Sequence, residues 1–470
     1  MEPPPHKYAK GLRGNALLAV VVTFCSLGFL LFGYDQGVMG GLVINPLFLG
    51  LDARLQDPDI LGITVATFLL GGLAGSILAS TLSNKIGRKP IVLSASVLTI
   101  IGGAVQSAAV NLGMLISFRI ILGIGVGLMT SLCPALLLEF CPTRIRGMVS
   151  SIELILCATG LVLSFWVDYG AASYTSSFSW RFPLALQVAF PLLMIPFGLL
   201  MPESPRYLAA NHDDAGALAV LHRIYPNDPS EAERVMTQLQ EAIRLEHEVS
   251  RSSGYWTAFQ NNKQRFRYRT LLALGVQFCQ QSSGINVVTY YGTYVFSTSL
   301  GLEPKAALLM NGWNGILAVG STTVSVLTGL VDSVGRIRLM MIGAAMMGIS
   351  MAILAGTTGP QHAGDKMYGA AGTAFIFIFL SFFSSCWLAP SWIYPSEIAP
   401  LAIRGQVASM GSGVNLLSNF AVVQITPKAI QNISNRYFIV FAVFNAVTVF
   451  ALYFLYPETS RLTLEEIDLL

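Results

Sequence analysis

Twelve long apolar segments constrain the fold of this chain more than any other feature. Each is long enough for an α-helix to cross a bilayer, which takes ~20 residues at ~1.5 Å per residue. Charged residues make up 11% of the chain, far below the ~25% of soluble domains. We therefore predict an all-α polytopic membrane protein embedded in the lipid bilayer. The segments cover residues 15–43, 58–82, 91–110, 113–138, 148–169, 182–201, 270–299, 306–331, 339–357, 369–394, 405–427 and 437–456.

Lysine and arginine residues are concentrated in alternate loops between these segments. Cytoplasmic loops of membrane proteins carry an excess of such residues, so we expect both termini to be cytoplasmic, most simply in the plasma membrane. The net charge of +3 reflects this loop bias, and we expect no nucleic-acid partner. The basic residues in the loops after the second, fourth, eighth and tenth segments are Lys85, Arg88, Lys89, Arg144, Arg146, Arg336, Arg338 and Arg404.

Three charged motifs occur once in each half of the chain. This internal repeat predicts two six-helix halves with the same orientation, related by a pseudo-twofold axis along the membrane normal. We place the boundaries at 1–202 for the N-terminal half, 203–268 for a cytoplasmic helical linker, 269–457 for the C-terminal half and 458–470 for a short cytoplasmic tail. The paired motifs are Gly87-Arg88 and Gly335-Arg336, Glu139 to Gly147 and Glu397 to Gly405, and Pro202-Glu203-Ser204 and Pro457-Glu458-Thr459.

The seventh apolar segment carries an unusual number of polar side chains. Residues 277–291 contain three glutamines, an asparagine and two tyrosines. Such groups are costly inside a bilayer unless they face protein or water. A local helix break at Gly284 would direct the polar side chains on either side of it into one cavity. We interpret the segment as a hydrophilic binding site. The alternative is polar contact between helices, which usually takes one or two such residues.

The motifs as a set resemble those of the sugar porter family of the major facilitator superfamily, over essentially the whole chain. Some stretches resemble the fungal glycerol/proton symporters and their relatives, such as Trp180-Arg181-Phe182-Pro183 and Asn419-Phe420-Ala421. The resemblance implies the major facilitator fold, with 12 transmembrane helices around a central cavity, and transport by alternating access. The residues that carry the family resemblance are Gly33-Tyr34-Asp35, Gly87-Arg88-Lys89, Arg119, Pro202 to Arg206, Gln280 to Tyr291 and Pro457-Glu458-Thr459.

The resemblance also implies a set of substrate-binding residues. In helix 8, Asn311 and Asn314 are both candidates, and neither is preferred. The glutamine positions of helix 5 are occupied by Leu154 and Leu161, so the N-terminal half offers fewer hydroxyl partners than a typical hexose transporter. This difference favours a smaller or less polar polyol. The residues implied to bind substrate are Gln280, Gln281, Asn286, Tyr290, Tyr291, Trp392 and Asn415, and the two tyrosines resemble those of the family's outer gate.

Asp35 and Arg119 lie at similar depths, ~10 Å from the outer ends of their segments. A lone charge at the bilayer centre costs ~2.5–3.5 kcal/mol or more, so two opposite charges at one depth suggest a pair. One interpretation is a static ion pair. The other, which the resemblance supports, is a proton switch in which protonation of Asp35 releases Arg119.

The charged motifs on the cytoplasmic side suggest an inner gate. We expect ion pairs that form when the protein faces outward and break when it faces inward. The alternative is simple anchoring, in which each solvated pair contributes only ~0–1 kcal/mol. The expected pairs are Arg88 with Glu139, Arg336 with Glu397, and Arg146 or Arg404 with the opposing half.

Glu153 lies in the fifth segment beside Leu154. It is expected either to pair with Arg144, Arg146 or a neighbouring cation, or to bind a polyol hydroxyl.

The sequence as a whole predicts a proton-coupled transporter of a sugar or polyol. A passive hexose or pentose facilitator and a sugar-sensing receptor are the alternatives. We expect a monomer without cofactor or metal site, and no enzymatic activity, because no nucleophile–base pair or phosphate-binding loop is present.

Overall fold

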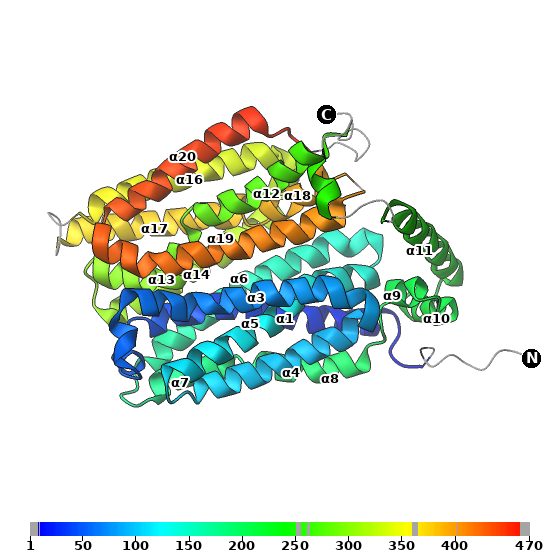
Figure 1. Cartoon of the computed structure of the whole chain (residues 1–470), viewed down its shortest axis with the longest axis horizontal. Coiled ribbons are helices and arrows are strands. Elements are labelled where there is room, and N and C mark those ends of the chain that lie inside the picture. The colour runs from blue at the N-terminus through cyan, green and yellow to red at the C-terminus, as the bar shows by residue number, and fades with distance from the viewer. Residues whose placement is uncertain are drawn as a thin grey trace, which may run out of the picture.

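The computed structural model describes residues 8, 10–250, 255–260, 264–359, 365–400 and 402–460. These residues form two helical bundles that lie side by side (Figure 1). The first contains α1 (Gly14–Leu42), α2 (Pro46–Leu49), α3 (Pro58–Ile86), α4 (Arg88–Ser107), α5 (Leu112–Phe140), α6 (Arg146–Ala171), α7 (Phe178–Leu186) and α8 (Ala189–Leu200). The second contains α12 (Phe266–Ser282), α13 (Ile285–Tyr294), α14 (Pro304–Leu327), α15 (Leu330–Val334), α16 (Arg336–Thr357), α17 (Lys366–Cys386), α18 (Pro390–Ile398), α19 (Arg404–Ile433) and α20 (Arg436–Leu455).

The twelve expected crossings are all helical. α7 with α8, α12 with α13, α14 with α15, and α17 with α18 each make one crossing in two pieces. Within the described part of the chain, nine crossings are long and apolar enough to span a membrane by those criteria alone. The other three crossings, α12/α13, α14 and α19, carry the polar side chains of the candidate site. Polar groups at membrane depth must face protein or water, so these three helices are expected to line an interior.

The predicted break in the seventh segment is present. Gly284 separates α12 from α13 with φ +99°, in the left-handed region. A Cβ at this position would lie 2.8 Å from Met351 Cε and 3.0 Å from Phe441 Cγ. Both the backbone conformation and the tight packing therefore require glycine here.

Helices α9 (Pro205–Ala210), α10 (Asp214–Ile224) and α11 (Pro229–Ser250) connect the bundles and lie at one end of the molecule (Figure 1). We call this end the linker side and the opposite end the far side. Asp228 caps α11, because its carboxylate accepts a hydrogen bond from Glu231 N at 3.1 Å. Arg223 ties the linker to α1 by donating to the Leu12 carbonyl at 2.9 Å. The expected tail falls largely at 461–470, outside the described residues.

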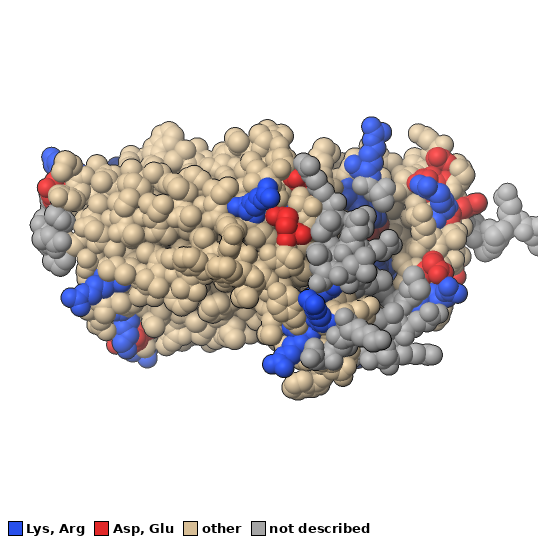
Figure 2. All heavy atoms as spheres, turned by 90° about the horizontal axis from the view of Figure 1, so that it is seen from above, with Lys and Arg blue, Asp and Glu red and all other residues tan. Residues whose placement is uncertain are grey.

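Charged side chains are unevenly distributed over the surface. Figure 2 shows them gathered toward the two ends of the visible face, with a broad uncharged band between them. Many large apolar side chains are exposed, among them Leu199, Val324 and Phe450. A water-soluble protein would bury such residues, whereas here the band matches the apolar interior of a bilayer.

The bundles contact each other on the far side and in the middle. A Cβ on Gly62 would lie 2.1 Å from the Gln424 carbonyl, so α3 and α19 approach closely there. Lys428 pairs with Asp59 at 2.6 Å. Trp166 of α6 meets Trp313 of α14 with ring centroids 6.0 Å apart. The linker-side ends of α3 and α19 expose side chains such as Thr81 and Ser409. The far side is thus closed.

Candidate functional site

A cluster of five amide side chains lies where α12, α13 and α19 meet. Asn415 Nδ2 donates to Gln277 Oε1 at 2.6 Å and to Gln280 Oε1 at 2.8 Å. Gln281 Nε2 donates to Asn415 Oδ1 at 2.9 Å, and Asn286 Nδ2 donates to Gln281 Oε1 at 2.9 Å. Because the helix breaks at Gly284, the side chain of Asn286 in α13 reaches the side chain of Gln281 in α12. Each group both donates and accepts hydrogen bonds, as a site for hydroxyl-rich ligands requires.

Ser391 joins the cluster from α18 and was not expected from the sequence. Its hydroxyl accepts from Gln280 Nε2 at 2.7 Å, and its carbonyl accepts from Gln277 Nε2 at 2.9 Å. Trp392 is the next residue and is 44% exposed. Ser391 therefore contacts the amide cluster, while the indole ring of Trp392 beside it has an accessible face. The adjacent tryptophan was the only sequence signal that pointed to this serine.

The two tyrosines of α13 lie apart from the amide cluster, toward the far side. Tyr291 donates to the Val423 carbonyl at 3.1 Å. Tyr290 is fully buried, and its hydroxyl has no hydrogen-bond partner. Both side chains pack into the apolar core of the N-terminal bundle. They belong to the contact between the bundles rather than to the amide cluster.

The two helix 8 candidates also lie toward the far side. Asn311 donates to Thr293 Oγ1 at 3.1 Å. Asn314 is fully buried, and neither of its amide atoms has a partner. Gly315 beside it packs on Val162 and Phe165 of α6. Asn314 therefore lies in the helix that contacts the opposite bundle.

Asp35 and Arg119 do not form an ion pair in this structure. Both are buried, and neither carboxylate oxygen of Asp35 has a hydrogen-bond partner. Arg119 instead donates from Nη2 to the Val65 carbonyl at 3.2 Å and lies over the Phe68 ring at 5.9 Å. The expectation of a static pair is not met here, because the guanidinium has taken partners on α3.

Two further carboxylates are buried in the N-terminal bundle. Glu153 is 4% exposed, and its Oε1 has no partner. It lies in electrostatic contact with Cys25 and Cys141. Arg146, one of its expected partners, donates instead to the Cys141 carbonyl at 3.1 Å. Asp168 was not singled out from the sequence, and it accepts from Gly41 N at 3.1 Å.

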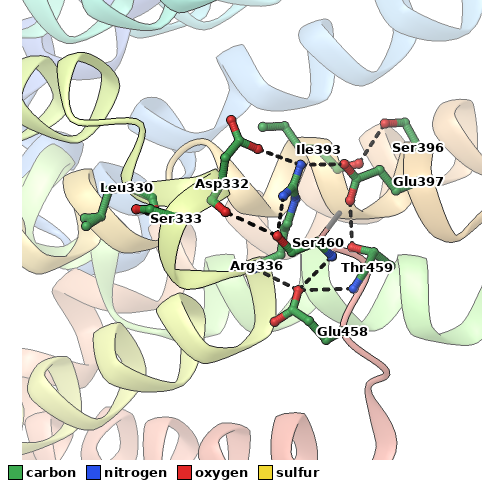
Figure 3. Close-up of polar contacts among 10 residues, drawn as sticks. All are labelled: Leu330, Asp332, Ser333, Arg336, Ile393, Ser396, Glu397, Glu458, Thr459 and Ser460. Carbon is green, nitrogen blue, oxygen red and sulfur yellow. Dashed lines mark hydrogen bonds and ion pairs between the residues drawn. The ribbon is translucent and has the colours of Figure 1, made fainter. Parts of the chain in front are cut away.

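The linker side of the C-terminal bundle carries a dense polar network around Arg336 (Figure 3). Arg336 pairs with Glu397 at 3.0 Å, as expected, and also with Asp332 at 2.9 Å. Glu458 accepts from the backbone nitrogens of Arg336 and Ile337 at 2.9 and 3.1 Å. A carboxylate in this position caps the start of α16 and interacts favourably with the helix dipole.

The N-terminal bundle repeats this arrangement with fewer contacts. Arg88 pairs with Glu139 at 3.4 Å. Glu203 accepts from Lys89 N at 3.2 Å and so caps α4 as Glu458 caps α16. The residue equivalent to Asp332 is Asn84, which removes one ion pair. The capping role of the two Pro-Glu motifs was missed, although their repetition was the signal that pointed to it.

These contacts differ from the expected inner gate, in which the ion pairs break when the protein faces inward and Arg146 or Arg404 pairs with the opposing half. Arg88 and Arg336 each pair within their own bundle, and both pairs are intact although the bundles meet on the far side. Arg404 donates to the Ala399 carbonyl at 3.4 Å, and Arg146 likewise binds a carbonyl of its own bundle. The pairs therefore fasten helices within a bundle. Both pairs are intact in this conformation.

Comparison with known proteins agrees with the fold. The model of the family described as "Sugar (and other) transporter" matches residues 20–470. The chain is 32% identical to Sugar transporter STL1 of Saccharomyces cerevisiae, covering 98% of this chain and 82% of STL1. It is 31% identical to Probable polyol transporter 6 of Arabidopsis thaliana, covering 98% and 95%.

Among solved structures, the inward open conformation of the xylose transporter XylE from E. coli superimposes with a TM-score of 0.80. The two are 26% identical, and the match covers 96% of this chain and 99% of XylE. A structure described as the proton:xylose symporter XylE bound to a bromodeoxyglucose matches with a TM-score of 0.77 at 25% identity, covering 97% and 99%.

Fold and site together define a multi-pass membrane transporter of the major facilitator type, and not an enzyme. The chain belongs to the sugar (and other) transporter family.

Proposed function

We propose that this protein takes up a sugar or polyol together with protons, by alternating access across the plasma membrane, with the linker side in the cytoplasm. The observation that carries the coupling is Asp35, buried without a partner while Arg119 bonds to α3. One structural relative, XylE, is described as a proton:xylose symporter, which supports the same interpretation.

The charge state of Asp35 links the proton to the conformation. Burying an ionised carboxylate without a partner is strongly unfavourable, so the closed far side favours the protonated form. When the far side opens, water and Arg119 would again stabilise the ionised form. A proton that Asp35 takes up from outside would therefore favour closure of the far side, and its loss toward the linker side, where protons are scarcer, would leave an ionised carboxylate that favours reopening, once per cycle.

The energy available from one proton is sufficient for accumulation. A proton contributes ~2.3 kcal/mol per 100 mV of membrane potential and ~1.36 kcal/mol per pH unit. Each ~1.4 kcal/mol supports a tenfold concentration ratio. Coupling would thus allow uptake from dilute, acidic medium.

The amide cluster of Gln280, Gln281, Asn286 and Asn415 is proposed to bind the hydroxyl groups of the substrate. Trp392 supplies an adjacent aromatic face. Leu154 and Leu161 replace two amides on the opposite wall, so a small or less polar polyol is favoured over a hexose. The relative described as a polyol transporter supports this class.

The test is uptake of labelled glycerol, xylose, glucose and a larger polyol in cells that lack their own transporters. We expect uptake that rises in acid medium, collapses with a protonophore and is accompanied by alkalinisation of the medium. Saturable uptake that is insensitive to pH and protonophore would instead show a passive facilitator. Binding without any uptake would show a sensor.

The proposed orientation needs a separate measurement. In a cysteine-free background, Asn432→Cys is expected to react with a membrane-impermeant maleimide added outside. Labelling only from the cytosol would reverse the assignment of the two sides.

A further inference from the structure

The side chain of Tyr290 belongs to one bundle but is buried in the other. Tyr290 and Tyr291 of α13 pack into the apolar core formed mainly by the N-terminal bundle. A Cβ on Gly40 of α1 would lie 3.6 Å from the Tyr290 carbonyl, so α13 runs directly along α1. This contact is part of the closed far side.

Buried polar atoms without partners gather around this tyrosine. They are both carboxylate oxygens of Asp35, Nε of Arg119, the Tyr290 hydroxyl and Oδ1 of Asn419. Tyr290 is in electrostatic contact with Asp35 and with Arg119, and its hydroxyl lies beside the Asn419 side chain. Four helices, α1, α5, α13 and α19, thus contribute to one polar centre.

The unpartnered atoms complement one another chemically. Arg119 Nε is a donor, Asn419 Oδ1 is an acceptor, and the Tyr290 hydroxyl is both. A neutral Asp35 would add one donor and one acceptor. Buried polar groups in folded proteins are nearly always hydrogen-bonded, so these groups are suited to share bonds directly or through water.

We propose that Tyr290 and Asn419 are the contribution of the C-terminal bundle to the proton site. On closure of the far side they come near Asp35 and Arg119, where they would stabilise the guanidinium electrostatically or through a bridging water, so that closure and protonation of Asp35 become one event. This inference rests on the proposed proton coupling and adds to it the groups that connect the proton to the moving bundle.

The surroundings contain few other groups that titrate. Tyr34 lies on α1 itself and donates to the Pro183 carbonyl. From α6, Cys157 acts electrostatically on Tyr290, and Asp168 acts on Tyr34. Tyr291 on α13 is engaged by the Val423 carbonyl. The charged residues of α3 and α19 stand at or near the ends of those helices, at Asp59, Lys85, Arg404 and Lys428. Asp35 and Arg119 are therefore the charged pair on which Tyr290 acts.

The experiment compares the pH profiles of uptake for wild type, Tyr290→Phe and Asn419→Ala, together with substrate-induced alkalinisation. Loss of a polar interaction with a charged group, direct or through water, changes an equilibrium by about tenfold. Closure would then require a higher proton concentration. The pH of half-maximal uptake is therefore expected to shift by about one unit toward acid. The matched control is Tyr294→Phe, one turn further along and beside Thr298, which should leave the profile unchanged.

The outcomes separate this inference from the proposed function. If wild type shows no alkalinisation, the proton coupling itself fails, and the inference fails with it. If wild type alkalinises the medium but Tyr290→Phe follows the wild-type profile, only the inference is overturned. A raised KM for substrate exchange at every pH, with an unmoved pH profile, would assign Tyr290 to substrate binding and also overturn it.

Discussion

At the scale of single residues, the amide cluster decides how a hydroxylated ligand can be held. Gln281 connects Asn286 to Asn415 through two hydrogen bonds of 2.9 Å each. A substrate hydroxyl that enters exchanges these bonds for its own, so the net gain per contact is modest, ~0.5–1.5 kcal/mol. Affinity then depends on several such contacts acting together.

The first prediction concerns this cluster. Gln281→Ala and Asn286→Ala should each weaken substrate binding by about three- to tenfold, which corresponds to one hydrogen bond of ~0.5–1.5 kcal/mol. KM for uptake, normalised to surface expression, measures the effect. Gln431→Ala, an exposed amide on α19, is the control. Wild-type KM values in both cluster variants would remove the cluster from the binding site.

Glu153 gives a second prediction at this scale. It is 4% exposed and lies in the N-terminal bundle, where its charge acts on Cys25 and Cys141. Gln has nearly the same shape and removes no ion pair, so Glu153→Gln should fold normally and keep the order of preference among polyols and hexoses. Competition between labelled glycerol and glucose checks this. A changed order would show that Glu153 contacts the substrate after all.

At the scale of helices, the break at Gly284 determines where α13 points. Any other residue at φ +99° is strained, by ~1–2 kcal/mol, and a Cβ would also clash with Met351 and Phe441. Gly284→Ala should therefore lower thermal stability and displace Asn286 from Gln281. The melting temperature in detergent and KM are the two readouts.

Gly356→Ala provides the matched control for that substitution. Gly356 lies in α16 with nothing within 4 Å of a new Cβ, and alanine favours the helix. Its melting temperature should equal or exceed that of wild type. Equal melting temperatures and KM values for Gly284→Ala and wild type would show that the break does not depend on glycine.

At the scale of the whole molecule, the closed far side makes a prediction about cross-linking. Lys428 and Asp59 face each other across the two bundles at 2.6 Å. In a background without native cysteines, Asp59→Cys with Lys428→Cys should be joined by a bifunctional methanethiosulfonate cross-linker and lose uptake, because the far side can no longer open. Reductant should restore uptake, and each single variant should be unaffected by the cross-linker. Full uptake by the cross-linked protein would exclude alternating access through this side.

Much of the architecture could be predicted from the sequence. Apolar length, basic loops and the internal repeat are local or periodic properties, and they predicted twelve crossings in two halves. The glycine at 284 predicted the break. The polar residues Gln280, Gln281, Asn286 and Asn415 were recognisable as candidates because polar groups at membrane depth must face protein or water.

Tertiary structure alone decided which of these groups meet. The sequence places Asp35 and Arg119 at similar depths in the membrane. In the structure, however, Arg119 donates a hydrogen bond to α3, and Asp35 has no hydrogen-bond partner. Ser391 joins the amide cluster, and Glu203 and Glu458 cap helices from the ends of other segments. Such contacts depend on how helices distant in the chain are packed. In a transporter that packing changes during the cycle, so depth and periodicity along one segment cannot specify it.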